Sequence, residues 1–258
     1  MKTFEQYIKE AVDFRLGGKA NKGIHYNYFP KDDEELMSLM KELIEERGDH
    51  GNYNDIDISN VTYLGFAFLG EQTFNGDISQ WDTSNVKSME RMFNEAEAFN
   101  CNISNWDTSK VTDMSYMFNG AKAFNQPIGS WNTGNVERMG DMFWKAKSFN
   151  QDISSWDTKK VKYMYGMFYG AKAFNQPIGS WNTSSVINMG DMFFDAESFN
   201  QDISGWDTSN VENMKGMFMW AGKFNQDISR WNVSKVSNRI DTFKNCPIKE
   251  KFKPKFNQ

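Results

Sequence analysis

Hydrophobic side chains return at the same positions every 25 residues along most of this chain. The segment Phe99–Phe124 shows one complete unit, which begins Phe-Asn-x-x-Ile-x-x-Trp-Asp-Thr and continues, two residues later, as Val-x-x-Met-x-x-Met-Phe-x-x-Ala-x-x-Phe. One tryptophan marks each complete unit, namely Trp81, Trp106, Trp131, Trp156, Trp181, Trp206 and Trp231. A period this strict predicts a repeat array in which each unit buries its apolar side chains against the next.

Each unit contains two kinds of spacing. The short, polar-flanked segment Phe99–Ile103 is typical of a brief strand, whereas Val111, Met114, Met117 and Ala121 are spaced as on one face of a short helix or 3-10 segment. The predicted fold is therefore an α/β repeat solenoid resembling leucine-rich repeats. A parallel sheet is expected on one face and short helices or 3-10 segments on the other.

The array is predicted to cover residues 52–248 with about eight units, and both end units are degenerate. Ile56 takes the tryptophan position at one end, while Arg239 and Thr242 replace the methionines at the other. Such decay is expected of terminal units that cap a stack. The segments Gly120–Thr133 and Gly170–Thr183 are identical, which indicates that the array grew by copying two units at once.

The flanking segments form three further predicted parts. Residues 1–18 are expected to be an amphipathic helix, and residues 19–51 a linker followed by a second helix that Pro30 and Asp32 open and Gly48 ends. The second helix is expected to cap the first unit and so to cover an open edge. Residues 249–258 form a basic tail, for which a solvated state is favoured over contact with an anionic surface.

Polar positions in the units allow two interpretations each. The asparagine after the first Phe, as in Asn100, is expected to satisfy backbone groups in a ladder rather than to bind a ligand. The tryptophan is expected to fill a wide corner of the stack rather than to be exposed for binding. Asp and Asn interchange at positions such as Asp107 and Asn132, which favours a turn-forming role over a calcium ladder or a catalytic pair.

The charge balance narrows the function classes. With 29 Lys and Arg against 34 Asp and Glu, the net charge of −5 argues against nucleic-acid binding. Cys101 and Cys246 would lie several layers apart, so free thiols and a reducing compartment are expected. The N-terminus lacks the uninterrupted apolar region of a secretory signal, and no stretch is long enough to span a membrane, so a cytoplasmic or virion location is expected.

The sequence offers little that resembles an active site. The only histidines, His25 and His50, lie outside the repeats, and neither metal-ligand spacing nor a Gly-rich phosphate loop is present. No nucleophile or acid is paired with a residue that would tune it. We therefore expect no enzyme activity, no metal and no cofactor.

Binding residues are better sought where the units differ. The position after Met-Phe is occupied by Asn94 and Asn119 and then by a large apolar run, Trp144, Tyr169, Phe194 and Met219. These four residues, joined by Tyr165 and Trp220, are the predicted binding residues, because an exposed stripe of this kind is unusual for a monomer. The alternative is that the side chains only stack on one another along the array.

The repeat resembles a known family. The motif Val111-x-x-Met114-x-x-Met117-Phe118 and the segment Trp106-Asp107-Thr108 are similar to the BspA-type leucine-rich-repeat surface proteins, in the Met- and Phe-rich version found in mycoplasmal lipoproteins as a domain of unknown function. The resemblance covers about residues 52–248 and implies an open right-handed solenoid used for adhesion or protein recognition. Unlike that family, this chain is expected to have no lipoprotein cysteine motif, signal peptide or surface anchor, which argues against a cell-surface location.

The first eleven residues resemble a second group of proteins. Met1-Lys2-Thr3-Phe4 followed by Tyr7-Ile8 is similar to the capsid-targeting leader of internal head proteins in T-even-type bacteriophages. That resemblance implies cleavage between Glu10 and Ala11 by a head protease, against the plainer interpretation of an N-terminal docking helix.

Three functions therefore remain open from the sequence. The first is a non-enzymatic protein-binding or structural module, with a protein partner or a second copy of the chain bound. The second is an internal phage head protein, delivered with the genome and inhibiting a host factor, with a phage head or host protein as its partner. The third is a protein similar to a cell-surface adhesin.

Overall fold

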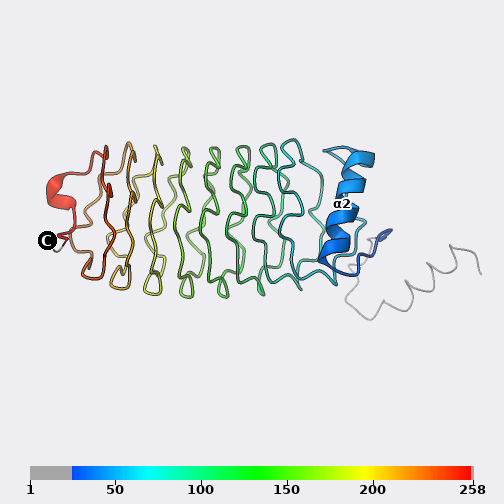
Figure 1. Ribbon diagram of the computed structural model, residues 1–258, viewed down its shortest axis with the longest axis horizontal. Coiled ribbons are helices and arrows are strands. Elements are labelled where there is room, and N and C mark those ends of the chain that lie inside the picture. The colour runs from blue at the N-terminus through cyan, green and yellow to red at the C-terminus, as the bar shows by residue number, and fades with distance from the viewer. Residues whose placement is uncertain (1–24, 257–258) are drawn as a thin grey trace, which may run out of the picture.

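The computed structural model describes residues 25–256. Figure 1 shows a regular stack of coils, with helix α2 (Asp33–Arg47) at one end and the C-terminal segment at the other. Parallel bridges join equivalent residues of successive units, from Tyr63 and Ser88 to Asn213 and Asn238. The prediction that 25-residue units lie on one another is confirmed.

Like side chains meet in continuous columns inside the stack. The rings of Phe93, Phe118 and Phe143 follow one another with centroids 5.6 and 5.7 Å apart. Trp131 and Trp156 are 6.5 Å apart and only 1° from parallel. Because equivalent rings stay nearly parallel, each of these units is close to a simple translation of its neighbour.

The regular elements expected inside each unit are not present. In the described range 25–256, the helices are α2 and the 3-10 turn η1 (Glu250–Phe252), and the units are joined by isolated bridges rather than extended strands. The predicted helix or 3-10 segment over Val111–Ala121 is therefore wrong. Its apolar side chains are buried as expected, but the backbone between them follows a different path.

That path is a ladder of overlapping turns, which we call the turn ladder. The N–H groups of Met114, Tyr116, Phe118 and Gly120 all donate to carbonyls of the next unit, at distances of 2.7 to 3.0 Å. The intervening N–H groups of Met117, Asn119 and Ala121 donate three residues back within their own unit. Successive N–H groups thus donate alternately to the next unit and within their own unit. This pattern satisfies the backbone hydrogen-bonding groups without a helix.

The turns of the turn ladder depend on residues with a left-handed backbone conformation. Each unit has two residues with positive φ, four positions apart, such as Tyr116 (59°) with Gly120 (74°) and Asp141 (55°) with Lys145 (54°). A helix cannot continue through residues of this hand. The non-glycine members are Phe66, Arg91, Glu95, Tyr116, Asp141, Lys145, Asp191, Asp195, Trp220, Asp241 and Asn245.

In the part of the unit that begins at Phe99, side chains rather than paired strands join successive units. The predicted strand Phe99–Ile103 is wrong, since the N–H of Asn100 donates to the Asn75 side chain (2.8 Å) rather than to a neighbouring backbone. The indole Nε1 of Trp106 donates to the Ile78 carbonyl of the previous unit. In six of the units a buried threonine hydroxyl at the corner, as in Thr108, donates to a carbonyl of the next unit.

Helix α2 caps the first unit, as predicted. Asp32 accepts the N–H of Glu35 at the N-terminus of the helix, and Gly48 ends it with φ 75°. One face buries Leu36, Met40 and Leu43 in the same core as the repeats. The Asp33 carboxylate also accepts the N–H groups of Thr62 and Tyr63, which closes a backbone row that continues through the array.

The C-terminal segment caps the opposite end, which corrects the expectation of a solvated tail. Ile248 and Pro254 are buried, and Phe256 lies 6.4 Å from Phe243 of the last unit. The N–H of Lys249 donates to the side chain of Asn225, where the next unit's asparagine would otherwise donate. The segment therefore ends both the core and the asparagine ladder.

Candidate functional site

The predicted binding residues lie on the turn ladder, where the alternating backbone places side chains outward. Trp144 and Tyr169 stack at a centroid distance of 3.7 Å and an angle of 4°, and Tyr169 and Phe194 stack at 4.3 Å and 2°. All three are half-buried. We call these three rings and Met219, which follows them in the same position, the aromatic row.

The aromatic row combines the two interpretations left open by the sequence. Its rings stack on one another, as the simpler alternative held, yet they also remain partly exposed to solvent. Because ring faces are used within the row, ring edges are left for a partner. Trp220, at the neighbouring left-handed position, is 50% exposed.

Tyr165 belongs to a different cluster from Trp220, which lies two units further along the chain. Its ring occupies the space above Gly140, where an added Cβ would collide with it. Burial raises the pKa of the Tyr165 phenol, and its hydrogen bond with Tyr116 adds to this rise. Tyr165 is thus held by its own neighbours rather than presented with the row.

Beside the aromatic row, glycine in one unit alternates with a larger residue at the same position in the next unit. The two residues between the methionines are Gly140-Asp141, then Tyr165-Gly166, then Gly190-Asp191, then Lys215-Gly216. The Oδ1 atoms of Asp141 and Asp191 occupy the place where a Cβ would stand on the glycine of the next unit. Each glycine thus leaves room for its neighbour's side chain.

Asp141 is the most perturbed acid on this surface. It is only 5% exposed, and its Oδ1 has no hydrogen-bond partner in the described structure. Burial raises its carboxyl pKa from 3.8 to about 6, the Asp191 charge adds to the rise, and the Tyr116 hydroxyl opposes it by donating a hydrogen bond. The pKa of Asp191 is raised by burial as well.

Sequence reasoning missed these two acids. The signal that would have revealed them is the alternation of Gly-Asp with x-Gly between the methionines, which has the same 50-residue period as the duplicated segments. A left-handed position filled by Asp rather than Gly also marks them, because Asp tolerates this conformation better than most residues.

The other polar rows have structural roles, as the sequence indicated. Asn150 Oδ1 accepts the N–H of Asn175 and also Nε2 of Gln176, which confirms the asparagine ladder. The tryptophans are buried at the corners. Asp107 Oδ1 accepts the N–H of Ser109, the hydrogen bond of an Asx turn. Asp152 Oδ1 accepts the N–H of Ser154 in the same way.

Titratable groups elsewhere form no evident centre in the described residues. Across residues 25–256, no three His, Cys, Asp or Glu side chains are placed to hold a metal ion. Both cysteines are free thiols, and burial raises the pKa of each, which makes them poorer nucleophiles. His25 and His50 are exposed, and no described helix is long and apolar enough to cross a membrane.

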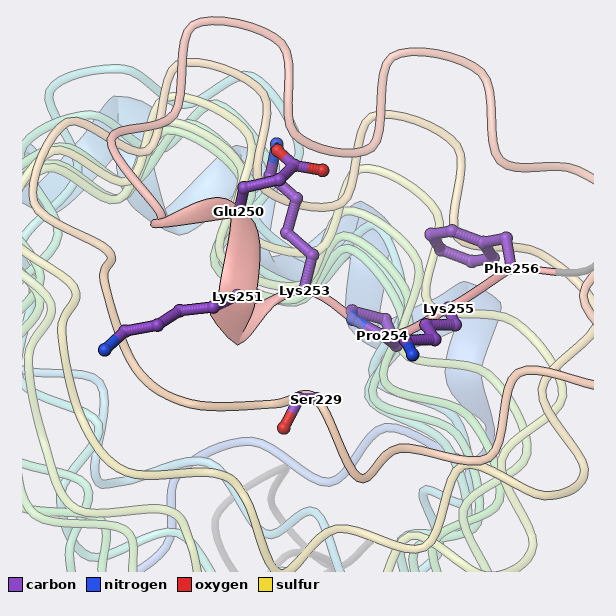
Figure 2. A pocket seen from close by; sticks show the side chains of 7 residues that line it. All are labelled: Ser229, Glu250, Lys251, Lys253, Pro254, Lys255 and Phe256. Carbon is purple, nitrogen blue, oxygen red and sulfur yellow. The ribbon is translucent and has the colours of Figure 1, made fainter.

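A pocket of about 490 Å³ lies at the C-terminal end, and Figure 2 shows the side chains around it. Lys253 pairs with Glu250 at 2.6 Å, so part of its charge is already neutralised. Figure 2 shows Lys251 pointing away from this pair, and Phe256 standing apart on the other side. The lysines do not converge on one point, so we assign the pocket no ligand.

The proposed processing residues Glu10 and Ala11 lie outside the described residues. Cleavage there, and the resemblance to a phage leader, stay predictions.

The fold and its surface define a class of protein, a repeat protein of stacked 25-residue units with a periodic aromatic core and few regular helices or strands. The chain belongs to the family described as "Mycoplasma protein of unknown function, DUF285", whose model matches residues 37–156 and again residues 145–256. This confirms the resemblance to the Met- and Phe-rich mycoplasmal domain. Neither the curated proteins nor the solved structures include a match.

Proposed function

We propose that this protein is a non-enzymatic repeat protein, a variant of the leucine-rich-repeat type, that binds another protein chain through the aromatic row. The observation that supports this best is the change of residue along one position of the turn ladder. Asparagine occupies it in two units, and large apolar side chains occupy it in the next four. The core of those units is no different, so packing inside the stack does not require the change.

Physical properties of the row suit protein recognition. Stacked rings are already ordered, so binding costs little side-chain entropy. Aromatic residues and methionine are enriched at protein interfaces, and partly exposed apolar residues lose contact with water when a partner covers them. Carboxylates and lysines around the row, including Asp195 and Lys145, provide a polar rim.

The test uses substitutions that the array itself has already accepted. Asn94 and Asn119 occupy the row position in neighbouring units, so Trp144→Asn with Tyr169→Asn should leave the fold intact. A photo-reactive phenylalanine analogue placed at Phe194 should crosslink to a partner, whereas the same group at exposed Ser130, outside the turn ladder, should not.

A partner found in this way is then purified and its affinity measured. The double Asn variant should weaken binding at least tenfold, with circular dichroism unchanged. Equal affinity of the variant and the wild type, or equal crosslinking from Ser130, would contradict the proposal.

A further inference from the structure

Charges of opposite sign lie on the two sides of Tyr169 along the aromatic row. Lys145 and Lys147 lie one unit before the unit of Tyr169, and Asp195 and Glu197 occupy the equivalent positions one unit after it. Lys172 contacts both carboxylates, Asp195 at 3.7 Å and Glu197 at 2.5 Å, so these two acids are neighbours on the surface. At these two positions the unit before Tyr169 is therefore basic and the unit after it is acidic.

The row is also straight. Trp144, Tyr169 and Phe194 deviate from parallel by only 4° and 2°, so the three units follow one another with almost no rotation. A straight, untwisted surface can meet another such surface over several units at once. Strongly twisted stacks would lose contact after one or two.

We infer that the occupant of the aromatic row is a second copy of this chain, docked antiparallel about a twofold axis that crosses the row at Tyr169. This rests on the proposed function and names the partner. With the axis parallel to the surface and perpendicular to the stack, each residue before the central unit faces its equivalent after it. The twofold operation repeats every such contact twice.

This register brings together groups that complement each other. Lys145 faces Asp195, and Lys147 faces Glu197. Farther out, Arg91 faces Asp241. Opposite charges across an interface favour one register and disfavour others.

The same register matches shapes as well as charges. Trp220, which is 50% exposed, faces Gly120. Gly120 has no side chain of its own, and the exposed Glu95 carboxylate lies over it. The indole N–H of Trp220 can donate to that carboxylate while its ring fills the space beside it.

In this register like charges face each other at two places, and at both the repulsion is reduced by contacts within each chain. Asp141 faces Asp191, but both carboxylates point at glycines of their own chain, Gly166 and Gly216. Lys172 lies near the axis and is neutralised by its own Glu197 and Asp195.

Charge exchange tests the register directly. Lys145→Asp and Asp195→Lys each place two like-charge pairs in the twofold interface, so each variant alone should dimerise at least tenfold more weakly than the wild type in sedimentation velocity. Mixing the two variants should restore a heterodimer, because positions 145 and 195 then carry opposite charges at both of their meetings. Lys159→Asp, an exposed change outside the row, is the matched control and should leave dimerisation unaltered.

Circular dichroism of each variant shows that the fold is retained. A wild type that stays monomeric up to high micromolar concentration, dimers that survive the single exchanges, or a mixture that fails to recover would each overturn the inference. A monomeric wild type that still crosslinks another protein through Phe194 would overturn only the second copy and leave the proposed function standing.

Discussion

Individual residues carry strain in this protein at regular intervals. A left-handed conformation costs an L-residue about 1–2 kcal/mol, and the turn ladder imposes it on two residues of every unit. Glycine fills some of these positions, such as Gly70, Gly120 and Gly170, whereas Glu95 and Lys145 fill the equivalent positions elsewhere. Strain is therefore unevenly spread over positions that are otherwise alike.

This predicts opposite effects from two exchanges at adjacent units. Glu95→Gly should raise stability by about 1 kcal/mol, because it removes the left-handed penalty at an exposed site. Gly70→Ala should lower stability by about 1 kcal/mol, since nothing lies within 4 Å of the new Cβ and only the backbone is affected. Thermal unfolding measures both, and changes of the same sign would contradict the assignment.

Asp141 makes stability depend on pH in a definite direction. Its folded-state pKa of about 6 lies above the ordinary 3.8, so the folded protein holds this proton more tightly than the unfolded chain does. The resulting contribution to folding stability is fully present below pH 4 and is lost as the pH rises through 6. The shift corresponds to about 3 kcal/mol. Asp141→Asn should therefore be more stable than the wild type at pH 8, by about 1–3 kcal/mol.

Urea unfolding at pH 4 and at pH 8 measures this difference. The gain should shrink or vanish at pH 4, where the wild-type carboxyl is protonated. Asp191→Asn, at the equivalent position two units on, should show a change of the same sign. A gain at pH 8 that persists unchanged at pH 4 would show that charge is not the cause.

At the scale of elements, the asparagine ladder joins the units where no strand does. Asn150→Ala should lower stability by about 2 kcal/mol, because the N–H of Asn175 loses its acceptor. Asn150→Asp keeps an accepting oxygen and should cost less. If thermal unfolding shows equal losses for the two variants, the accepting oxygen is not what holds this side of the unit.

The elements also show what the sequence could and could not reveal. The period of 25, the buried columns, the Trp corner, the asparagine ladder and the cap α2 all follow from side-chain type and spacing, and the structure confirms them. The turn ladder was not predictable in this way. Val111, Met114, Met117 and Ala121 keep the spacing of a helix, while Tyr116 and Gly120 in the same segment have the wrong hand for one.

The C-terminal cap was missed for a related reason. Lys249, Lys251, Lys253 and Lys255 dominate residues 249–258 and favour a solvated tail. The alternating apolar residues between them, Phe252, Pro254 and Phe256, are the ones that pack on the last unit. The lysine charges favoured a solvated tail in the prediction, although the buried positions of this segment follow the alternation of its apolar residues.

At the scale of the whole molecule, the repeat should tolerate removal of two units. Deleting residues 120–169 joins Asn119 to Gly170, and the following segment Gly170–Thr183 is identical to the one removed. Such a chain should fold cooperatively with a lower melting temperature, because stability in a stack is roughly a sum over units and their interfaces.

Small-angle scattering should show a molecule shorter by about 10 Å, two layers of about 4.8 Å each. Deleting residues 120–156 breaks the 25-residue register and serves as the control, which should not fold as a complete stack. A register-keeping deletion that unfolds as badly as this control would show that the units are not interchangeable.

The turn ladder has an electrical consequence. Four rows of peptide N–H groups, those continuing from Met114, Tyr116, Phe118 and Gly120, all point toward the C-terminal end, whereas two rows, through Thr112 and Ala123, point the other way. Peptide dipoles aligned head to tail add up, as they do in a helix. Along this face, the C-terminal end of the stack should therefore be the positive end of a dipole. Dielectric relaxation should record a dipole moment that increases with every unit added.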